Sequence, residues 1–165
     1  AAVPTAFADF WRTVVDGRLA ASTHERRATA LLVLRHVIAA ETRGGRAARL
    51  AAATPLLLSP PLLRVLANNL PQRANYLHTP AREAMEAVVT AAKADASRSV
   101  AAAALSVLLQ RDPAWDAHTR STGVASLSAL LDVAAMQRHA SFLRAVFAAP
   151  MAAGGEVVRG KRGSG

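Results

Sequence analysis

Along most of the chain, apolar residues recur every three or four positions, which is the spacing of one face of an α-helix. The first such stretch predicts a helix over residues 6–16, with Gly17 as its stop. The second predicts a helix from Ser22 to near Glu41. Ser22 and Glu25 have the spacing of a capping box, in which the hydroxyl accepts a hydrogen bond from the amide three residues on and the carboxylate reaches back to the cap.

Proline marks the boundaries of the later elements. A weaker helical segment over 46–53 is expected to end before Pro55. Two pairs, Ser59-Pro60 and Thr79-Pro80, place an N-capping hydroxyl directly before a proline at the first helical position, so each predicts a helix start. The further helices are predicted over 60–70, over 80–93, from Asp95 to Asp112, over 122–134 and over 136–148, with a loop around Trp115.

These helices define the predicted fold class. No segment shows the alternation of a half-buried strand, and the helices are joined by short turns that contain proline or glycine. We therefore predict an all-α fold, either an α-solenoid of antiparallel HEAT- or armadillo-like repeats or an irregular helix bundle. No exact repeat period is present, which is common in divergent helical repeats. The helical-repeat domain is predicted over 1–149 and a flexible basic tail over 150–165.

The charge of the chain points to an acidic partner. The formal net charge is +9 and is carried by 18 arginines and 2 lysines. Such a charge is typical of proteins that meet nucleic acid, an acidic protein tail or an anionic membrane surface, and arginine suits phosphate because it binds it with two parallel hydrogen bonds. Coding bias in a GC-rich genome favours alanine, arginine and glycine together, so it explains the arginine count equally well.

The chemistry of the chain argues against a catalytic site. Without cysteine there is no disulfide, thiolate nucleophile or cysteine-based zinc site. No two of the five histidines have the helical i, i+4 spacing of a metal site, and no phosphate-cradling loop or nucleophile elbow is present. We therefore expect neither an enzyme nor a cofactor. No apolar run approaches the roughly 20 residues of a membrane helix, and no membrane partner is expected.

Three groups of arginines are candidates for partner binding. The first lies in the charged first turn of a predicted helix. The second flanks Gly44-Gly45, which forms either a phosphate-contacting loop or, as we favour, a helix C-cap with arginines placed well for the helix dipole. The third surrounds a helical corner and forms either a basic ridge or ordinary solvated surface. The candidates are Arg26, Arg27, Arg43, Arg46, Arg49, Arg64, Arg73 and Arg82. Tyr76, His78 and Trp115 are expected to pack or to form hydrogen bonds rather than to bind a ligand.

Three blocks of the sequence resemble the DNA polymerase phi / Myb-binding protein 1A family. They are DGRLAASTHERRATALLVLRHVI over 16–38, LLLSPPLLRVLANNLPQRANYLHTPAREAMEAVV over 56–89 and AWDAHTRSTGVASLSALL over 114–131. The blocks follow the family's order. The aromatic residues that the family usually has after the Glu-Arg pair are replaced by Ala28, Thr29 and Ala30, and the third block lacks the usual lysines. The resemblance thus implies a distant member, of which this chain, beginning without methionine, would be one section.

The resemblance implies a function that the residues alone do not give. It implies a nuclear or nucleolar helical-repeat protein that acts in ribosomal DNA transcription and ribosome assembly. Its expected partners are ribosomal RNA or ribosomal DNA and ribosome-assembly proteins, bound through arginine-rich surfaces. The alternative is an adapter that holds a partner helix or an acidic tail without touching nucleic acid. The sequence shows no trio of carboxylates of the kind that two-metal nucleotidyl transfer requires.

Overall fold

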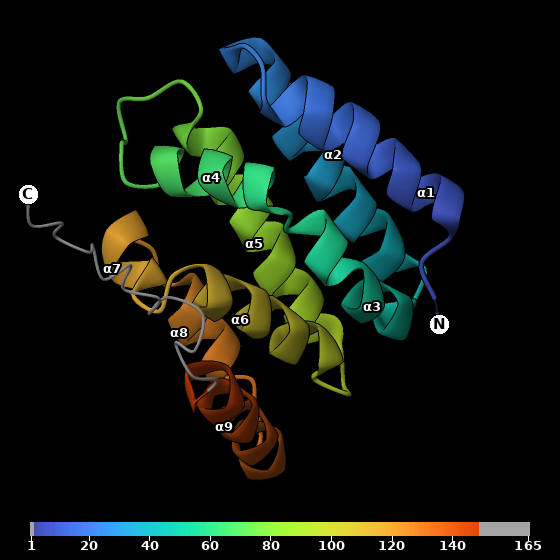
Figure 1. Cartoon of the computed structure of the whole chain (residues 1–165), viewed down its shortest axis with the longest axis vertical. Helices are drawn as coiled ribbons and strands as arrows, with labels where there is room; N and C mark the ends of the chain where they lie inside the picture. The colour runs from blue at the N-terminus through green and yellow to red at the C-terminus, as the bar shows by residue number, and fades with distance from the viewer. Residues whose placement is uncertain (1, 149–165) are drawn as a thin grey trace, which may run out of the picture.

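The computed structural model describes residues 2–148, and within them every regular element is a helix (Figure 1). The elements are α1 (Thr5–Phe10), η1 (Trp11–Ala20), α2 (His24–Arg43), α3 (Ala47–Leu57), α4 (Pro60–Asn69), α5 (His78–Ala94), α6 (Ser99–Arg111), α7 (Trp115–Thr119), α8 (Gly123–Ser128) and α9 (Val133–Ala148). The all-α prediction is confirmed. The tail predicted over 150–165 lies outside the described residues.

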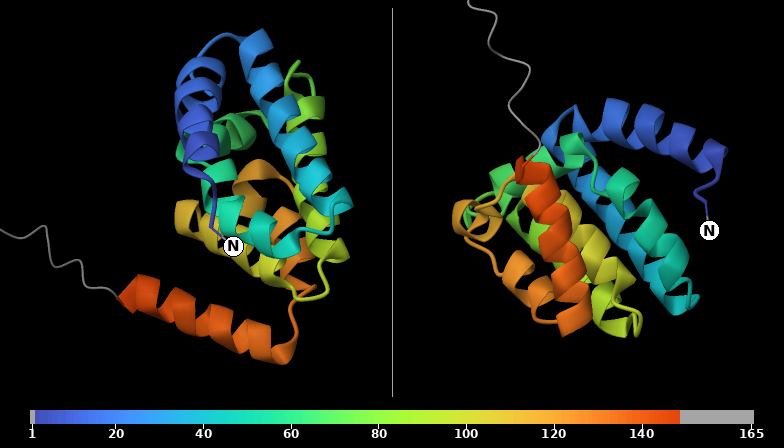
Figure 2. Two further views of the ribbon diagram at one scale, coloured as in Figure 1. Left: turned by 90° about the vertical axis from the view of Figure 1, so that its right-hand side faces the viewer. Right: turned by 60° about the horizontal axis from the view of Figure 1, so that its bottom comes forward.

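The longer helices stack in two rows. α2 lies beside α5, and α3 lies beside α6, so each hairpin of the chain packs on the hairpin before it (Figures 1 and 2). α8 continues the stack on α5 and α6, whereas α9 contacts α6 and projects away from the rest (Figure 2). This arrangement of successive helical hairpins is that of a short α-solenoid, the first of the two architectures that the sequence allowed.

The core is thin and rich in leucine and alanine. Leu31 and Leu34 of α2 and Leu105 and Leu108 of α6 are at most 1% exposed. Burial of each such side chain contributes about 1.5–3 kcal/mol. On α5 the buried face is mainly alanine, and these small side chains let the neighbouring helix backbones approach closely. The close contact between the rows therefore follows from the alanine content.

Gly17 does not end the first helix, contrary to the prediction. The chain passes from α1 directly into η1, a π-helix that runs on to Ala20. Glycine stops a helix by adopting a positive φ, and among the described glycines only Gly45 does so. Trp11, Val15 and Ala20 are spaced by four and five residues. The wider turn of the π-helix, with its hydrogen bonds between residues five apart, brings all three to one buried face.

The capping box predicted at Ser22 is also wrong. Thr23 occupies the N-cap position with extended backbone, and α2 begins at His24. The hydroxyl of Ser22 instead accepts a hydrogen bond from Nη1 of Arg26, at 3.3 Å. With the one-residue shift Glu25 lies two residues after the cap, and hydrogen bonds from its own amide and from the Thr23 hydroxyl lower the pKa of its carboxyl.

Pro55 does not break α3, which continues to Leu57. Pro55 is exposed in the last turn, where its ring meets solvent. Only one helical hydrogen bond is lost there, and the Leu58 amide still donates to the Thr54 carbonyl at 2.9 Å. A proline this close to a helix end is therefore tolerated.

The region after α6 also differs from the prediction. Trp115 begins the short helix α7 rather than lying in a loop, although its ring is buried as expected. The chain breaks between α8 and α9 at residues 129–132, earlier than predicted. Asp132 accepts a hydrogen bond from the Ala135 amide at 2.6 Å, which fixes the start of α9 at Val133.

Candidate functional site

A groove of about 1050 Å³ runs along the exposed face of α5. One wall is the loop between α4 and α5, and the other is the segment that joins α7 to α8, both on the left of Figure 1. We call this hollow the α5 groove. It is lined by Leu70, Pro71, Arg73, His78, Arg82, Met85, Glu86, Val89, Thr90, Lys93, Arg120, Ser121, Thr122, Gly123 and Ser126.

Positive charge dominates the α5 groove. Four cationic side chains line it against one carboxylate, Glu86. Glu86 is already engaged by Arg82, whose Nη1 lies 2.8 Å from its Oε1. The remaining cations have no ion pair among the described residues. They are Arg73, Lys93 and Arg120. Since all three are exposed, an anionic ligand that enters the groove meets them without first displacing an internal carboxylate.

The helical period of α5 places its charges on the groove side. Arg82, Glu86, Val89 and Lys93 follow one another at intervals of four, three and four residues, which is one face of a helix. At 1.5 Å per residue, Arg82 and Lys93 lie about 16 Å apart along the axis. The opposite face of α5 is buried against the stack. The groove floor is thus a direct result of the sequence pattern of this helix.

The α7–α8 wall is held in place by Asp116. Its carboxylate accepts hydrogen bonds from the amides of Val124 and Ala125, at 2.9 and 2.8 Å, and from the hydroxyl of Ser121, at 3.2 Å. These contacts tie the start of α8 to α7 and order the connecting segment. Arg120 lies within this segment and adopts the left-handed conformation, with φ of 52°. This conformation is sterically unfavourable for an L-residue, so it lowers the stability of the fold while it holds Arg120 at the groove.

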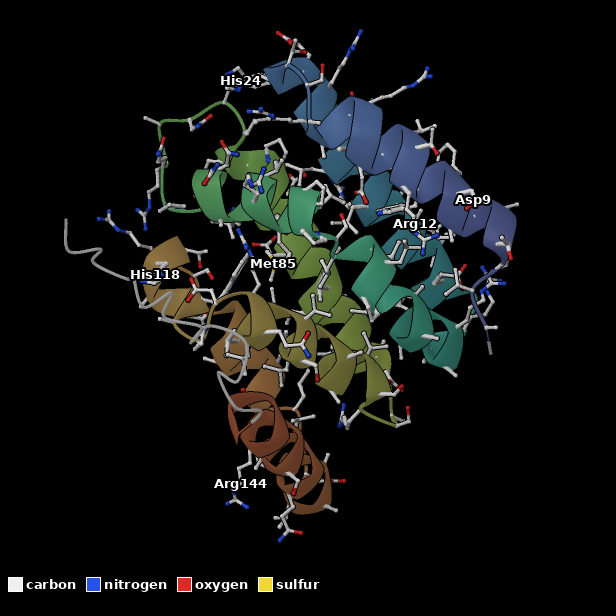
Figure 3. All side chains as sticks on the ribbon, in the orientation of Figure 1. Asp9, Arg12, His24, Met85, His118 and Arg144 are labelled. Carbon is white, nitrogen blue, oxygen red and sulfur yellow. The ribbon has the colours of Figure 1, made fainter. Side chains whose placement is uncertain are left out.

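The corner that forms the other wall is supported by hydrogen bonds. Asn75 accepts one from the Leu77 amide at 3.0 Å, and the His78 ring contacts the Asn69 carbonyl at 3.3 Å. His78 is therefore the hydrogen-bonding corner residue that the sequence indicated. Tyr76, which was expected to pack or to form hydrogen bonds, is 72% exposed, so it does not pack. Met85 of α5 faces the α7–α8 segment on the floor between the walls (Figure 3).

Two of the arginines near Gly44-Gly45 form ion pairs within the protein. Arg49 and Arg46 both bind Glu41, with Nε–Oε2 distances of 2.7 and 2.9 Å. The hydrogen bond from Arg49, with that from Arg46, lowers the pKa of Glu41 from 4.5 to about 2 despite its partial burial. The amides of Gly44, Gly45 and Arg46 donate to carbonyls of the last turn of α2. The loop has the geometry of the helix C-cap that we favoured from the sequence.

The other predicted arginines are spread over the surface. Arg26 contacts Ser22, and Arg27 is half-buried in the first turn of α2. Arg43 and Arg64 are exposed and lie outside the α5 groove. Of the eight candidates, the structure brings only Arg73 and Arg82 together in the groove, so a binding role for the others remains a prediction.

Sequence reasoning missed Lys93 and Arg120. Lys93 had a readable signal, since it continues the spacing from Arg82 along one face of α5. Arg120 had none, because its place depends on the turn between α7 and α8 and on how α8 packs. Within the described residues no three His, Asp or Glu side chains gather as metal ligands.

Among residues 2–148 no single helix is long and apolar enough to cross a bilayer. α3 and α4 reach the required hydropathy only when combined, and the chain bends by 79° between them.

Comparison with known proteins gives one result. Searches of curated proteins and of solved structures find no significant match. A family model described as DNA polymerase phi matches residues 2–162, nearly the whole chain. The description suggests a nuclear protein, but the word polymerase in it is no evidence for or against catalysis. With a match of this extent, the chain belongs to the DNA polymerase phi family.

Proposed function

We propose that this protein is a non-catalytic helical-repeat scaffold of the nucleolus that acts in ribosome biogenesis or ribosomal DNA transcription and binds nucleic acid through the α5 groove. The observation that carries the proposal is the set of exposed groove cations without an internal ion pair, Arg73, Lys93 and Arg120. Membership of the DNA polymerase phi family and the net charge of +9 support it.

The binding mechanism is electrostatic. Guanidinium and ammonium groups neutralise backbone phosphates and release the cations that had condensed on the nucleic acid, so affinity falls as salt rises. Contacts to phosphate fix the position of the nucleic acid but carry no sequence information. The protein thus holds its partner without reading bases, which suits a scaffold that acts at many positions along a long transcript.

A filter-binding titration with RNA and with duplex DNA tests this part of the proposal. We expect binding whose logarithmic affinity falls linearly with the logarithm of salt concentration. A folded sample that binds neither nucleic acid, or binds with no dependence on salt, would refute the nucleic-acid role. Fluorescence microscopy of the tagged full-length protein tests the nucleolar location, with exclusion from nucleoli as the contrary result.

The carboxylates support the non-catalytic part. Asp95, Asp116 and Asp132 cap helices, and Glu41 is bound by two arginines. Acidic side chains that are committed to the fold in this way are poorly placed to bind two metal ions for nucleotidyl transfer. A primer-extension assay with Mg²⁺ is expected to show no nucleotide incorporation, and incorporation above the background of a mock preparation would contradict the proposal.

A second candidate function is an adapter that holds an acidic partner helix. Its supporting observation is the apolar floor of the groove, where Met85 and Val89 lie between cationic side chains. The variant Arg73→Glu with Arg120→Glu discriminates the two functions. Loss of a co-purifying protein partner with unchanged RNA affinity favours the adapter, whereas loss of RNA affinity favours the scaffold proposed above.

A further inference from the structure

We infer that the α5 groove takes a single nucleic-acid strand, held by its backbone, in preference to a duplex. The inference rests on the proposed function and specifies which form of nucleic acid the same site accepts.

Cations line the groove on its floor and on both walls. Lys93 comes from the floor, Arg73 from the α4–α5 wall and Arg120 from the α7–α8 wall. Both walls rise beside one helix, and an α-helix with its side chains is only about 10–12 Å wide. A strand lying on α5 between the walls meets cations on three sides. A duplex is wider than a single α-helix, so we expect it to reach fewer of these cations at once.

Uncharged polar side chains also line the hollow. Its volume is about 1050 Å³, which leaves room for a chain to lie along α5. Thr90 on the floor and Thr122 on the wall are exposed and supply hydroxyl groups that donate hydrogen bonds to phosphate oxygens, whereas the Ser121 hydroxyl already donates to Asp116. We expect a strand that lies along α5 to accept hydrogen bonds from both hydroxyl groups.

The kinds of side chain on the floor set the type of recognition. Apart from the imidazole of His78, which contacts the Asn69 carbonyl, no aromatic side chain lines the groove. Proteins that hold single strands by stacking do so on aromatic rings, so stacking does not contribute here. Met85 is only 5% exposed, so the half-buried Val89 provides the apolar contact of the floor, which accepts any base or sugar. Binding is therefore expected to depend on phosphates and to be nearly independent of base sequence.

Fluorescence anisotropy with two labelled RNA probes tests the inference on the full chain. One probe is an oligouridine of about twenty nucleotides, and the other is a blunt RNA duplex of the same length. Each is titrated at salt concentrations from about 50 to 200 mM. At equal salt we expect the single strand to bind at least tenfold more tightly. Since about three or four phosphates are neutralised, its logarithmic salt slope should lie near −2 to −3.

Single substitutions assign the binding to the groove. Arg73→Gln, Lys93→Gln and Arg120→Gln should each reduce the magnitude of the slope by about 0.7. Arg111→Gln, which removes the same charge outside the groove, should leave it unchanged. An oligoadenosine probe of equal length should bind within about threefold of oligouridine, because no stacking platform lines the groove.

The contrary outcomes separate this inference from the proposed function. Equal or tighter binding of the duplex, weakened by the groove substitutions, overturns the preference for a single strand and leaves the nucleic-acid role intact. Single-strand binding that none of the groove substitutions alters overturns the assignment to the groove. Absence of binding to either probe by folded protein overturns both the inference and the proposed function.

Discussion

Gly123 of α8 lies so close to Met85 of α5 that a Cβ on the glycine would be 3.0 Å from the methionine Cε. This contact seats the start of α8 directly on the groove floor. Because Arg120 and Thr122 immediately precede Gly123 in the wall, the distance between the two helices sets where the wall stands relative to Lys93 and Arg82. The shape of the α5 groove thus depends on one residue that has no side chain.

Substitution Gly123→Val is expected to push α8 away from α5. The branched side chain overlaps the methionine, and overpacking of this kind costs about 1–3 kcal/mol of unfolding free energy. The displaced wall should also weaken RNA binding. Ala125→Val is the matched control, since Ala125 is exposed on the same helix and tests only the helix propensity of valine. Urea denaturation and anisotropy measure both effects, and equal results for the two variants would contradict the packing argument.

Substitution Arg120→Gly should separate stability from binding. Glycine adopts the left-handed conformation at no steric cost, so the free energy of unfolding should rise by up to about 1 kcal/mol. The same change removes a groove cation, so RNA affinity at low salt should fall about threefold.

The control for this effect is Arg98, which is also left-handed, with φ of 59°, but does not line the groove. Arg98→Gly should raise the stability in the same way and leave RNA affinity unchanged. A loss of stability in both variants would show that the two arginines are not strained.

The Glu41 cluster should make stability depend on acid pH. The Arg49 and Arg46 contacts hold the pKa of Glu41 near 2, below its usual 4.5, so the folded state favours the ionised carboxylate. Its contribution is therefore complete above pH 4.5 and is lost as the pH falls toward 2. Glu41→Gln should lower the unfolding free energy at neutral pH by about 1–3 kcal/mol, and the difference from wild type should shrink on acidification. A difference that is constant between neutral and strongly acidic pH would argue against the ion pairs.

Pro55→Ala should stabilise α3. Alanine restores the amide that proline lacks, and the exposed ring of Pro55 contributes little packing that would be lost. We expect an increase of about 1 kcal/mol in unfolding free energy, less than for a proline in the middle of a helix, because Pro55 lies in the last turn. Thermal unfolding followed by circular dichroism measures it, and a lower melting temperature would mean that the proline ring supports the fold.

Local signals in the sequence predicted much of the fold. The Ser59-Pro60 pair correctly placed the start of α4, because Pro60 favours the first helical position, although the Ser59 hydroxyl donates to Asp16 and does not cap the helix. The helical spacing from Arg82 to Lys93 in the sequence identifies the face of α5 that forms the floor of the groove. Gly17 misled because its neighbours Val15 and Ala20 are drawn into a common buried face, which the order of residues alone does not reveal.

The features that sequence reasoning missed depend on distant contacts. The two arginines that bind Glu41 reach it only because the chain reverses at Gly45, which has φ of 64°. Arg120 reaches the groove only because α8 packs on Met85. A list of arginines from the sequence therefore includes residues that form ion pairs within the protein and residues that are exposed to a partner. Only the tertiary arrangement separates the two kinds.

The central claim is that the α5 groove, and not positive charge in general, binds nucleic acid. Its most direct test compares two triple variants that each lose three positive charges. One is Arg73→Gln, Lys93→Gln and Arg120→Gln in the groove; the other is Arg43→Gln, Arg64→Gln and Arg111→Gln, all exposed and outside it. We expect the groove variant to lose at least tenfold in RNA affinity at low salt and the other to lose no more than about threefold. Equal losses in the two variants would contradict the claim.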